Sequence, residues 1–242
     1  MHAVILAGGK GTRLRPYTTV FPKPLMPVGD LPILEVVIRQ LRAAGCTGVT
    51  LAVGHLAELL IAFFGDGSRW GLPIDYVREE QPLGTVGALA LLPRFAEPFL
   101  LMNGDILTTL DYRALLAHHR ETGGVATIAM HERLVKVELG VIEHDANGQI
   151  TGYIEKPTLT YHVSMGIYVF EPRVRDAIVA GERLDFPDLV LRLLAAGERV
   201  MSYAYTGYWL DIGHPEDYEQ AVTEFGRQRE VFLPDERDVR GT

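Results

Sequence analysis

The 242-residue sequence contains a single cysteine, Cys46, and no long apolar run. One cysteine excludes an intrachain disulfide and cannot supply the several thiolates of a structural zinc site. No apolar segment approaches the roughly 20 residues that span a bilayer, and the apolar run at residues 3–7 is too short for a signal-peptide core. These shortages predict a cytoplasmic protein of a reducing compartment that does not bind a membrane.

The sequence also lacks acidic residues over positions 1–29, although the whole chain carries a formal net charge of -8. Four cations occupy this region: Lys10, Arg13, Arg15 and Lys23. A positive region in an acidic chain favours a small phosphorylated ligand over a nucleic acid or an anionic membrane. We therefore expect a small-molecule site near the N-terminus and no nucleic-acid partner.

Internal repeats, low-complexity linkers and sustained heptads are absent as well. With 48% apolar and 22% charged residues, the chain can bury a substantial core in one large α/β domain or two small ones. We expect a single domain over residues 1–242, with a polar, loosely ordered tail from about residue 229.

Short apolar runs alternate with segments of helical periodicity as far as Gly124. This alternation is typical of parallel strands joined by crossover helices. Strands are predicted at residues 2–7, 48–54, 72–77 and 98–105. Helices are predicted at residues 33–45, 57–67, 85–95 and 111–123.

Beyond Gly124 several strands follow in succession, which indicates an antiparallel or mixed extension of the same sheet. They are predicted at residues 125–131, 140–145, 150–157 and 163–172, with a turn at 145–148. A strand at 200–213 and helices at 174–182, 186–198 and 215–228 complete the chain. The predicted fold class is α/β: a Rossmann-like three-layer α/β/α fold with a mixed, mainly parallel central sheet.

The segment GGKGTR at residues 8–13 directly follows the first predicted strand. Because glycine has no Cβ, backbone N–H groups in such a loop can close on phosphate oxygens. The spacing fits neither a Walker P-loop nor the dinucleotide fingerprint, in which a third small residue would follow where Leu14 stands. A tight turn with incidental charges is the simpler alternative.

Two prolines flank Lys23 in PKPLMPV at residues 22–28, so the lysine is presented from a restrained backbone. Together, LAGGKGTRLRPYT at residues 6–18 and PKPLMPV resemble the N-terminal signature of the sugar-1-phosphate nucleotidylyltransferases. The two motifs are closest in sequence to those of the mannose-1-phosphate and heptose-1-phosphate guanylyltransferases, and the resemblance extends to about residue 220. It implies transfer of a nucleotidyl group from a nucleoside triphosphate to a sugar 1-phosphate, with release of pyrophosphate.

The resemblance implies roles for the residues that bind and activate the nucleotide. The arginine matching Arg13 contacts the triphosphate, and the lysine matching Lys23 stabilises charge that develops during transfer, so both are expected to be catalytic. The segment PLGTVGAL at residues 82–89 resembles the corresponding segment of GTP-using members more closely than that of thymidylyl-transferring members, which implies guanylyl transfer. The expected nucleotide-binding residues are Leu6, Ala7, Gly8, Gly9, Gly11, Thr12, Arg13, Gln81, Gly84 and Thr85.

Asp105 and Asp211 each lie at the end of an apolar strand, where open α/β sheets place their ligands. A helix-cap or turn role is the simpler alternative for such an aspartate. The resemblance implies that both bind Mg²⁺, which two aspartates can hold because phosphate oxygens and water complete its coordination. From the sequence, only the resemblance brings the two acids together.

The sugar-phosphate side of the site is implied by the resemblance alone. The segment YIEKP at residues 153–157 matches a motif in which the glutamate binds sugar hydroxyls and the lysine binds the phosphate. Many family members have asparagine where this chain has Ser164. The expected substrate-binding residues are Asn103, Gly140, Glu155, Lys156 and Ser164.

The implied partners are a nucleoside triphosphate and a manno-configured sugar 1-phosphate, either mannose or a heptose. A homo-oligomer is compatible with this interpretation. Three alternatives stay open: a thymidylyl- or uridylyl-transferring enzyme, a catalytically silent protein that binds nucleotide sugars, and a nicotinamide oxidoreductase. The glycine spacing disfavours the last of these.

Overall fold

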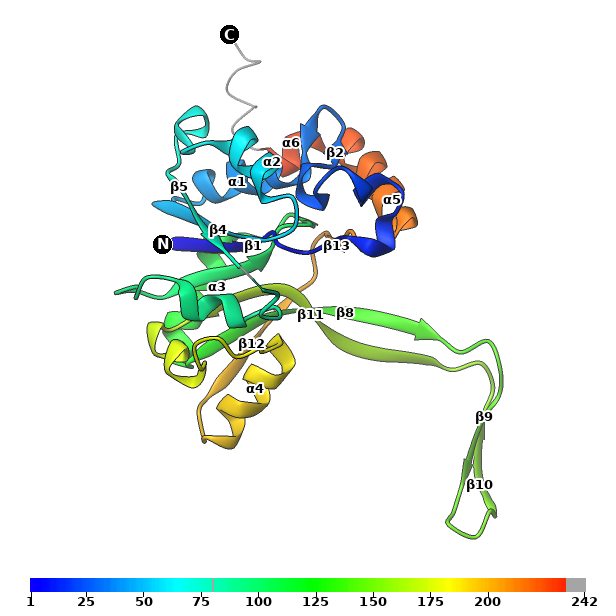
Figure 1. Cartoon of the computed structure of the whole chain (residues 1–242). Coiled ribbons are helices and arrows are strands. Elements are labelled where there is room, and N and C mark those ends of the chain that lie inside the picture. Colours follow the sequence, from blue (N-terminus) through cyan, green and yellow to red (C-terminus); the bar gives the residue numbers. More distant parts are fainter. Residues whose placement is uncertain (80, 234–242) are drawn as a thin grey trace.

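A computed structural model describes residues 1–79 and 81–233 and is built on a seven-stranded sheet with the order β12-β8-β11-β6-β1-β4-β5 (Figure 1). Four of the neighbouring pairs are parallel, and β11 is antiparallel to both β6 and β8. This mixed, mainly parallel sheet confirms the predicted fold class. The strands are β1 His2–Leu6, β4 Gly48–Val53, β5 Ile74–Arg78, β6 Phe99–Asn103, β8 Ala126–Lys136, β11 Thr158–Phe170 and β12 Val200–Tyr205.

Both faces of the sheet are covered, and β1 shows how the strand alternation produces two cores. Ala3 and Ile5 are buried with helices α1, α2 and α3, whereas Val4 between them is buried with α4 on the other side. The helices are α1 Ile33–Ala43, α2 Ala57–Phe64, α3 Tyr112–Thr122 and α4 Phe186–Ala195. The result is the predicted three-layer arrangement.

A third apolar cluster packs the C-terminal helices against the segment that follows the glycine loop. Helices α5 Pro215–Arg227 and α6 Arg229–Phe232 bury Phe225 and Phe232 against Leu14 and Met26. We expected a loosely ordered tail from about residue 229, which is wrong for residues 229–233, because Phe232 and Leu233 are apolar and buried. Residues 234–242 lie outside the described residues.

Two of the predicted helices are shorter in the structure than expected and are 3₁₀ helices instead of α-helices. Residues 85–95 form only the 3₁₀ helix η5 Gly87–Leu91, which ends where Leu92 becomes extended, as is usual for a residue before a proline. The N–H groups of Val86 and Gly87 donate to the Leu184 carbonyl and fix the start of this helix. Residues 174–182 are likewise helical only as far as Ala177, in η6 Pro172–Ala177, because the next residue, Ile178, is extended.

The strand predicted at residues 200–213 is divided between two sheets. Its first part is β12 of the central sheet, and its last part, β13 Trp209–Asp211, pairs antiparallel with β7 Ile106–Thr108 in a separate two-stranded sheet. A further two-stranded sheet, of β2 Pro27–Val28 and β3 Leu31–Pro32, precedes α1. The small β7–β13 sheet places Asp211 beside the segment that follows β6.

The strands predicted at residues 140–145 and 150–157 do not extend the central sheet. They form a separate hairpin of β9 Val141–His144 and β10 Ile150–Ile154, carried on the long outer ends of β8 and β11 (Figure 1). The turn predicted at 145–148 is present: the Asp145 carboxylate accepts the N–H groups of Asn147 and Gln149, and Gly148 has a positive φ of 86°. No helix among the described residues is long and apolar enough to cross a bilayer.

Stability should fall at mildly acidic pH because of His119 on α3. Its side chain is fully buried, with Nδ1 2.8 Å from the Thr127 hydroxyl and Nε2 3.3 Å from the Glu171 carboxylate. Burial lowers the pKa of His119, and Glu171 opposes this shift. The unfolded chain therefore takes up a proton first as the pH falls through about 6.5, which costs up to about 1.4 kcal/mol of unfolding free energy per pH unit.

Urea denaturation at pH 7.5 and pH 5.5 measures this loss. His119→Gln should reduce the difference between the two pH values, because glutamine does not titrate. An unchanged difference in the variant would contradict the assignment to His119.

Candidate nucleotide and phosphate site

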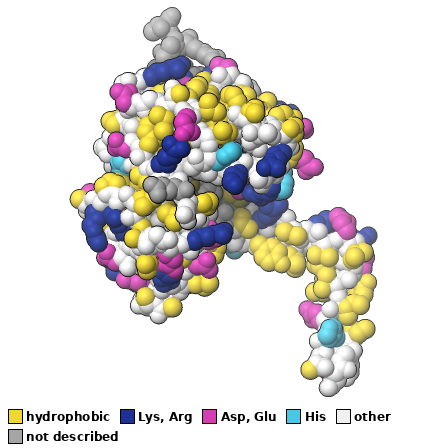
Figure 2. Space-filling view, in the orientation of Figure 1, with side chains coloured by type: hydrophobic (Ala, Val, Ile, Leu, Met, Phe, Trp, Pro, Cys, Tyr) yellow, Lys and Arg dark blue, Asp and Glu magenta, His cyan; other side chains and the backbone are white. Residues whose placement is uncertain are grey.

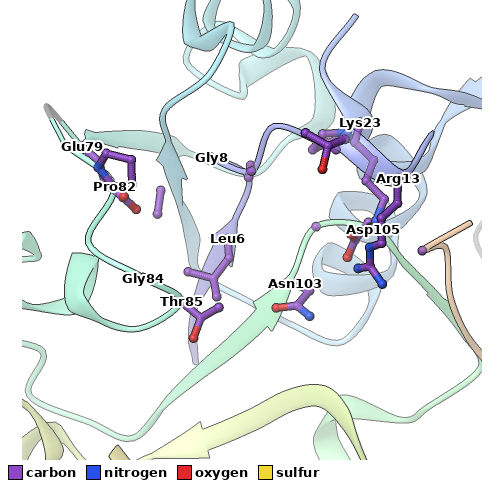
Figure 3. Close-up of a pocket in the computed structure, with 18 of the residues that line it drawn as sticks. Leu6, Gly8, Arg13, Lys23, Glu79, Pro82, Gly84, Thr85, Asn103 and Asp105 are labelled. Carbon is purple, nitrogen blue, oxygen red and sulfur yellow. Dashed lines mark hydrogen bonds and ion pairs between the residues drawn. The ribbon is translucent and has the colours of Figure 1, made fainter. Parts of the chain in front are cut away.

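A cavity of about 450 Å³ opens at the carboxyl ends of β1 and β6 (Figure 3). Leu6 ends β1 and Asn103 ends β6, and these strands are neighbours in the sheet. Because parallel strands bring their carboxyl ends to one edge, the residues after each strand meet here. The described lining residues of the predicted nucleotide-binding set are Leu6, Ala7, Gly8, Gly9, Gly11, Thr12, Arg13, Gly84 and Thr85.

The glycine loop has one tightly packed side and one open side. A Cβ on Gly8 would lie 3.2 Å from the Gly54 nitrogen, and one on Gly11, which has a φ of 58°, would lie 2.9 Å from the Thr18 methyl group. The Thr18 hydroxyl also donates to the Gly11 carbonyl at 2.7 Å. At Gly9 no atom lies within 4 Å of the Cβ position. The loop is therefore fixed from behind and open toward the cavity, as close approach of a phosphate requires.

Arg13 lies on the 3₁₀ helix η1 Thr12–Leu14, which the fully buried Leu14 anchors to the third core. The guanidinium lies against the turn after β13: a Cβ on Gly213 would be 3.4 Å from one of its nitrogens. The N–H groups of Gly213 and His214 both donate to the Asp217 carboxylate, at 3.1 and 2.7 Å, and so fix this turn. Arg13 is thereby held between the glycine loop and the end of β13.

Lys23 and Asp105 form an ion pair at the base of the cavity (Figure 3). Lys23 begins the 3₁₀ helix η3 Lys23–Leu25, and its side chain is only 10% exposed. Asp105 follows β6, and only its Oδ2 meets the lysine; Oδ1 is buried with no hydrogen-bond partner among the described residues. A buried carboxylate oxygen without a partner is costly, so this atom is suited to a cation.

Asp211 on β13 is brought beside Asp105 by strand pairing. Asp211 pairs with Ile106, and the next N–H, of Ile212, donates to the Asp105 carbonyl at 3.2 Å. Burial raises the pKa of Asp211, the charge of Asp105 raises it further, and Lys23 and Arg13 oppose the shift. The structure therefore brings together the two acids that the sequence left far apart.

These two carboxylates fit a divalent cation that also binds phosphate. Mg²⁺ usually takes one or two protein carboxylates and fills its other positions with phosphate oxygens and water. Among the described residues there is no group of three or more His, Cys, Asp and Glu side chains placed for a metal. Asp105, with its unpartnered Oδ1, and Asp211 supply the two carboxylates that such an open Mg²⁺ site needs. They are too few for a site in which protein side chains fill every metal position.

Three charged lining residues were not predicted from the sequence: Glu79, Arg183 and Asp185. The Asp185 carboxylate accepts the Thr85 N–H at 3.0 Å, and the Thr85 hydroxyl accepts the Phe186 N–H at 2.7 Å. The segment before α4 thus fixes the loop at residues 82–86 from about 100 residues away. The only sequence signal here was an aspartate before a predicted helix, which indicates a helix cap and gives no link to the cavity.

The nucleotidyl transferase family model matches residues 2–228 of the chain. This chain belongs to the nucleotidyl transferase family. It is 37% identical to a UTP–glucose-1-phosphate uridylyltransferase of Synechocystis over 92% of its length and 62% of that protein. It is also 37% identical to a mannose-1-phosphate guanylyltransferase of Mycobacterium tuberculosis over 94% of its length and 65% of that protein. The chain thus spans less than two thirds of these curated relatives.

Among solved structures of similar fold is HddC from Yersinia pseudotuberculosis complexed with GMP-PN. The two chains superpose with a TM-score of 0.72 and 25% identity, over 93% of this chain and 99% of that chain. All the residues that line the cavity, from Leu6 to Gly213, lie within residues 2–228, which the family model matches.

The remaining predicted residues of this family member are divided between the cavity and other parts of the chain. Asn103 and Asp105 line the cavity, whereas Gln81 and Asp211 are not among the lining residues. Ser164 lies on β11 with its hydroxyl 3.1 Å from that of Tyr168, two residues before Gly166, which packs against Asn103. The other three, Gly140, Glu155 and Lys156, lie on the β9–β10 hairpin and the segments beside it.

Proposed function

We propose that the chain transfers a guanylyl group from GTP to a sugar 1-phosphate, forming a nucleotide sugar and pyrophosphate. One observation carries this proposal: the cations Arg13 and Lys23 and the Asp105 carboxylate line one cavity with an open glycine loop, and Asp211 lies beside Asp105. That set suits two phosphorylated substrates and a divalent cation, in a chain that belongs to the nucleotidyl transferase family.

The attacking group in this reaction is a phosphate oxygen of the sugar 1-phosphate, which is anionic near neutral pH. A general base is therefore not required, and the protein must instead hold two polyanions in line and stabilise the charge of the transition state. The new bond joins that oxygen to the α-phosphorus, and the bond from the α-phosphorus to the pyrophosphate oxygen breaks. The leaving pyrophosphate carries away the electron pair.

Each charged residue has a separate task in this proposal. The loop N–H groups around Gly9 and the guanidinium of Arg13 bind the triphosphate and receive the charge of the leaving group. Lys23, which pairs with Asp105, lies at the base of the cavity, where its ammonium group can face the α-phosphate. Asp105 and Asp211 would hold Mg²⁺, which when bound neutralises phosphate charge and orients the reacting groups.

Guanine is favoured over the other bases by two comparisons. One of the two 37% identical relatives is named a guanylyltransferase, and HddC was solved with GMP-PN. The other 37% identical relative is named a uridylyltransferase, so uracil is the competing choice. The loop with Gly84 and Thr85 at the cavity would carry the selection, because one or two hydrogen bonds to a base edge can decide it.

The test measures pyrophosphate release with Mg²⁺ and mannose 1-phosphate, with GTP, UTP, dTTP and CTP present at equal concentration. The nucleotide-sugar products are separated and quantified. GDP-sugar should be the major product, by roughly tenfold or more if a single hydrogen bond of about 1.4 kcal/mol decides the base. A major UDP- or dTDP-sugar product would reject guanine and keep nucleotidyl transfer.

A catalytically silent protein that binds nucleotide sugars is the second candidate. It would bind product without releasing pyrophosphate from any pair of a nucleoside triphosphate and a sugar 1-phosphate. A panel of glucose, mannose and heptose 1-phosphates with all four nucleotides separates the two candidates. Binding of GDP-sugar without turnover in the whole panel would reject the proposed enzyme.

A further inference from the structure

The arm is the segment of residues 132–163: the outer ends of β8 and β11 together with the β9–β10 hairpin. Its strands are paired without interruption from Glu132 and His162 to Lys136 and Thr158, and the Val137 N–H then donates to the Pro157 carbonyl at 2.9 Å. At about 3.3 Å per residue, this paired section alone projects roughly 16 Å. Figure 1 shows the arm leaving the rest of the chain as a narrow ribbon.

The arm exposes many large apolar side chains (Figure 2). A two-stranded ribbon with water on both faces is at best marginally stable, and a contiguous exposed apolar surface marks an interaction site. The arm is therefore expected to pack against another protein surface. The exposed side chains are Leu134, Val135, Leu139, Ile142, Ile150, Tyr153, Ile154, Leu159 and Tyr161.

Lys156 lies in the arm between β10 and β11, in an unfavourable backbone conformation. Its φ is 44°, and Leu56 is the only other non-glycine residue with a positive φ among residues 1–79 and 81–233. A non-glycine residue in this region costs roughly 1–2 kcal/mol and is most often found at functional sites. The arm thus presents a cation from a strained turn, with Glu155 beside it.

The cavity of the same chain has little net charge for two phosphorylated substrates. Its described lining includes the cations Arg13, Lys23 and Arg183 and as many acids, Glu79, Asp105 and Asp185. Lys23 is paired with Asp105, and Arg183 lies 3.9 Å from Asp185. A triphosphate engages Arg13 and a divalent cation, so a second phosphate group still requires a cation.

We propose that the arm of one chain packs on a second copy, where its Lys156 and Glu155 complete the cavity for the sugar phosphate. The two copies exchange arms, so each cavity is completed by the other chain. This rests on the proposed function, because the bound group is the phosphate of the sugar substrate. Reciprocal exchange covers both apolar arms within one closed two-fold dimer.

The second copy is favoured over the arm's own chain by the strand pairing. Lys156 does not line the cavity of its own chain, and Figure 1 shows the β9–β10 hairpin at the far end of the arm, away from the central sheet. The unbroken pairing of residues 132–136 with residues 158–162 holds the arm in this extended form. Docking on a second copy keeps every one of these hydrogen bonds.

Complementation between two defective chains tests the exchange. Lys23→Ala damages the cavity and keeps the arm, and Lys156→Ala damages the arm and keeps the cavity. The two chains are co-expressed with different tags, and the heterodimer is purified through both. One site of the heterodimer then has an intact cavity and an intact arm, so about half of the wild-type rate per dimer should return. Each homodimer alone should be at least roughly tenfold slower than wild type.

A heterodimer of Lys23→Ala with Asp105→Asn is the matched control, because both cavities are damaged and no rate should return. A complementing heterodimer that is no faster than its parents overturns the exchange, as does a Lys156→Ala homodimer with the wild-type rate. Sedimentation velocity of the wild-type chain should show a dimer, and a monomer at the assay concentration also overturns it.

A cross-linking experiment keeps the test independent of catalysis. In a Cys46→Ala background, Lys156→Cys in one chain and Arg183→Cys in the other should be joined by a short bifunctional thiol reagent into a covalent heterodimer. Asp66→Cys, an exposed position that does not line the cavity, replaces Arg183→Cys in the control. A cross-link between the two variant chains, together with no nucleotide transfer by the wild-type chain, rejects the proposed function alone. Failure to form the covalent heterodimer, while the wild-type chain transfers nucleotide, rejects the exchange alone.

Discussion

Asp211→Asn should lower the rate of Mg²⁺-dependent nucleotidyl transfer by on the order of 100-fold or more, because it removes one of the two charges that we propose hold the metal. Asparagine has nearly the same volume, so the pairing of β13 with β7 should survive. Burial and the neighbouring charge of Asp105 both disfavour the charge of Asp211 in the folded chain. The melting temperature without metal should therefore not fall, while activity is lost.

Asp105→Asn should lower the rate by a similar factor but should also destabilise the fold. Lys23 is 10% exposed and pairs with Asp105, so the variant leaves a buried ammonium group without its partner. We expect a loss of about 1–3 kcal/mol in the free energy of unfolding, since Asp211 lies close enough to keep part of the attraction. The comparison of the two variants thus separates the metal role, which they share, from the structural ion pair, which only Asp105 makes.

Initial rates of pyrophosphate release over a range of Mg²⁺ concentrations measure the catalytic loss, and urea denaturation measures stability. The control is Asp176→Asn, because Asp176 is an exposed acid that pairs with Arg94 outside the cavity. It should leave the rate unchanged. Wild-type rates in both Asp105→Asn and Asp211→Asn would reject the metal assignment.

Local sequence patterns were sufficient where a residue's position depends on its neighbours in the chain. The run of residues 2–7 followed by GGKGTR predicted a strand and a phosphate loop, and β1 and the open loop at Gly9 are present. The helical periodicity of residues 33–45 likewise predicted α1. In these cases a buried face or a glycine turn is determined within a few residues, so tertiary contacts did not change the outcome.

Contacts between distant segments decided the features that the sequence did not predict. The run at residues 200–213 predicted one strand, and Asp211 lies beside Asp105 only because β13 pairs with β7 instead of continuing β12. The start of η5 is fixed by the Leu184 carbonyl, about 100 residues away, which accepts the N–H groups of Val86 and Gly87. The hairpin at residues 141–154 has a pattern suited to the central sheet, yet it lies outside that sheet on the arm.

The position of Lys23 explains why a lysine should affect turnover more than binding. Pro22 and Pro24 flank it in η3, and Leu25 and Met26 are buried after it, so its backbone is fixed. Its ammonium group pairs with the Asp105 carboxylate. Any new bond to phosphate therefore competes with an existing one, and the net gain in the ground state is small.

Lys23→Ala should consequently reduce kcat by on the order of 100-fold or more while raising KM by much less, since negative charge on the α-phosphate increases in the transition state and strengthens its bond to the ammonium group. Steady-state kinetics with GTP and a saturating sugar 1-phosphate measure both constants. The matched control is Lys10→Ala, because Lys10 lies on the same loop but does not line the cavity. It should change neither constant more than about twofold, as expected for a screened surface charge. A variant of Lys23 with unchanged kcat and a raised KM would instead make this lysine a ground-state phosphate clamp, and the charge on the reacting phosphate would then have to be stabilised by Arg13 and the metal alone.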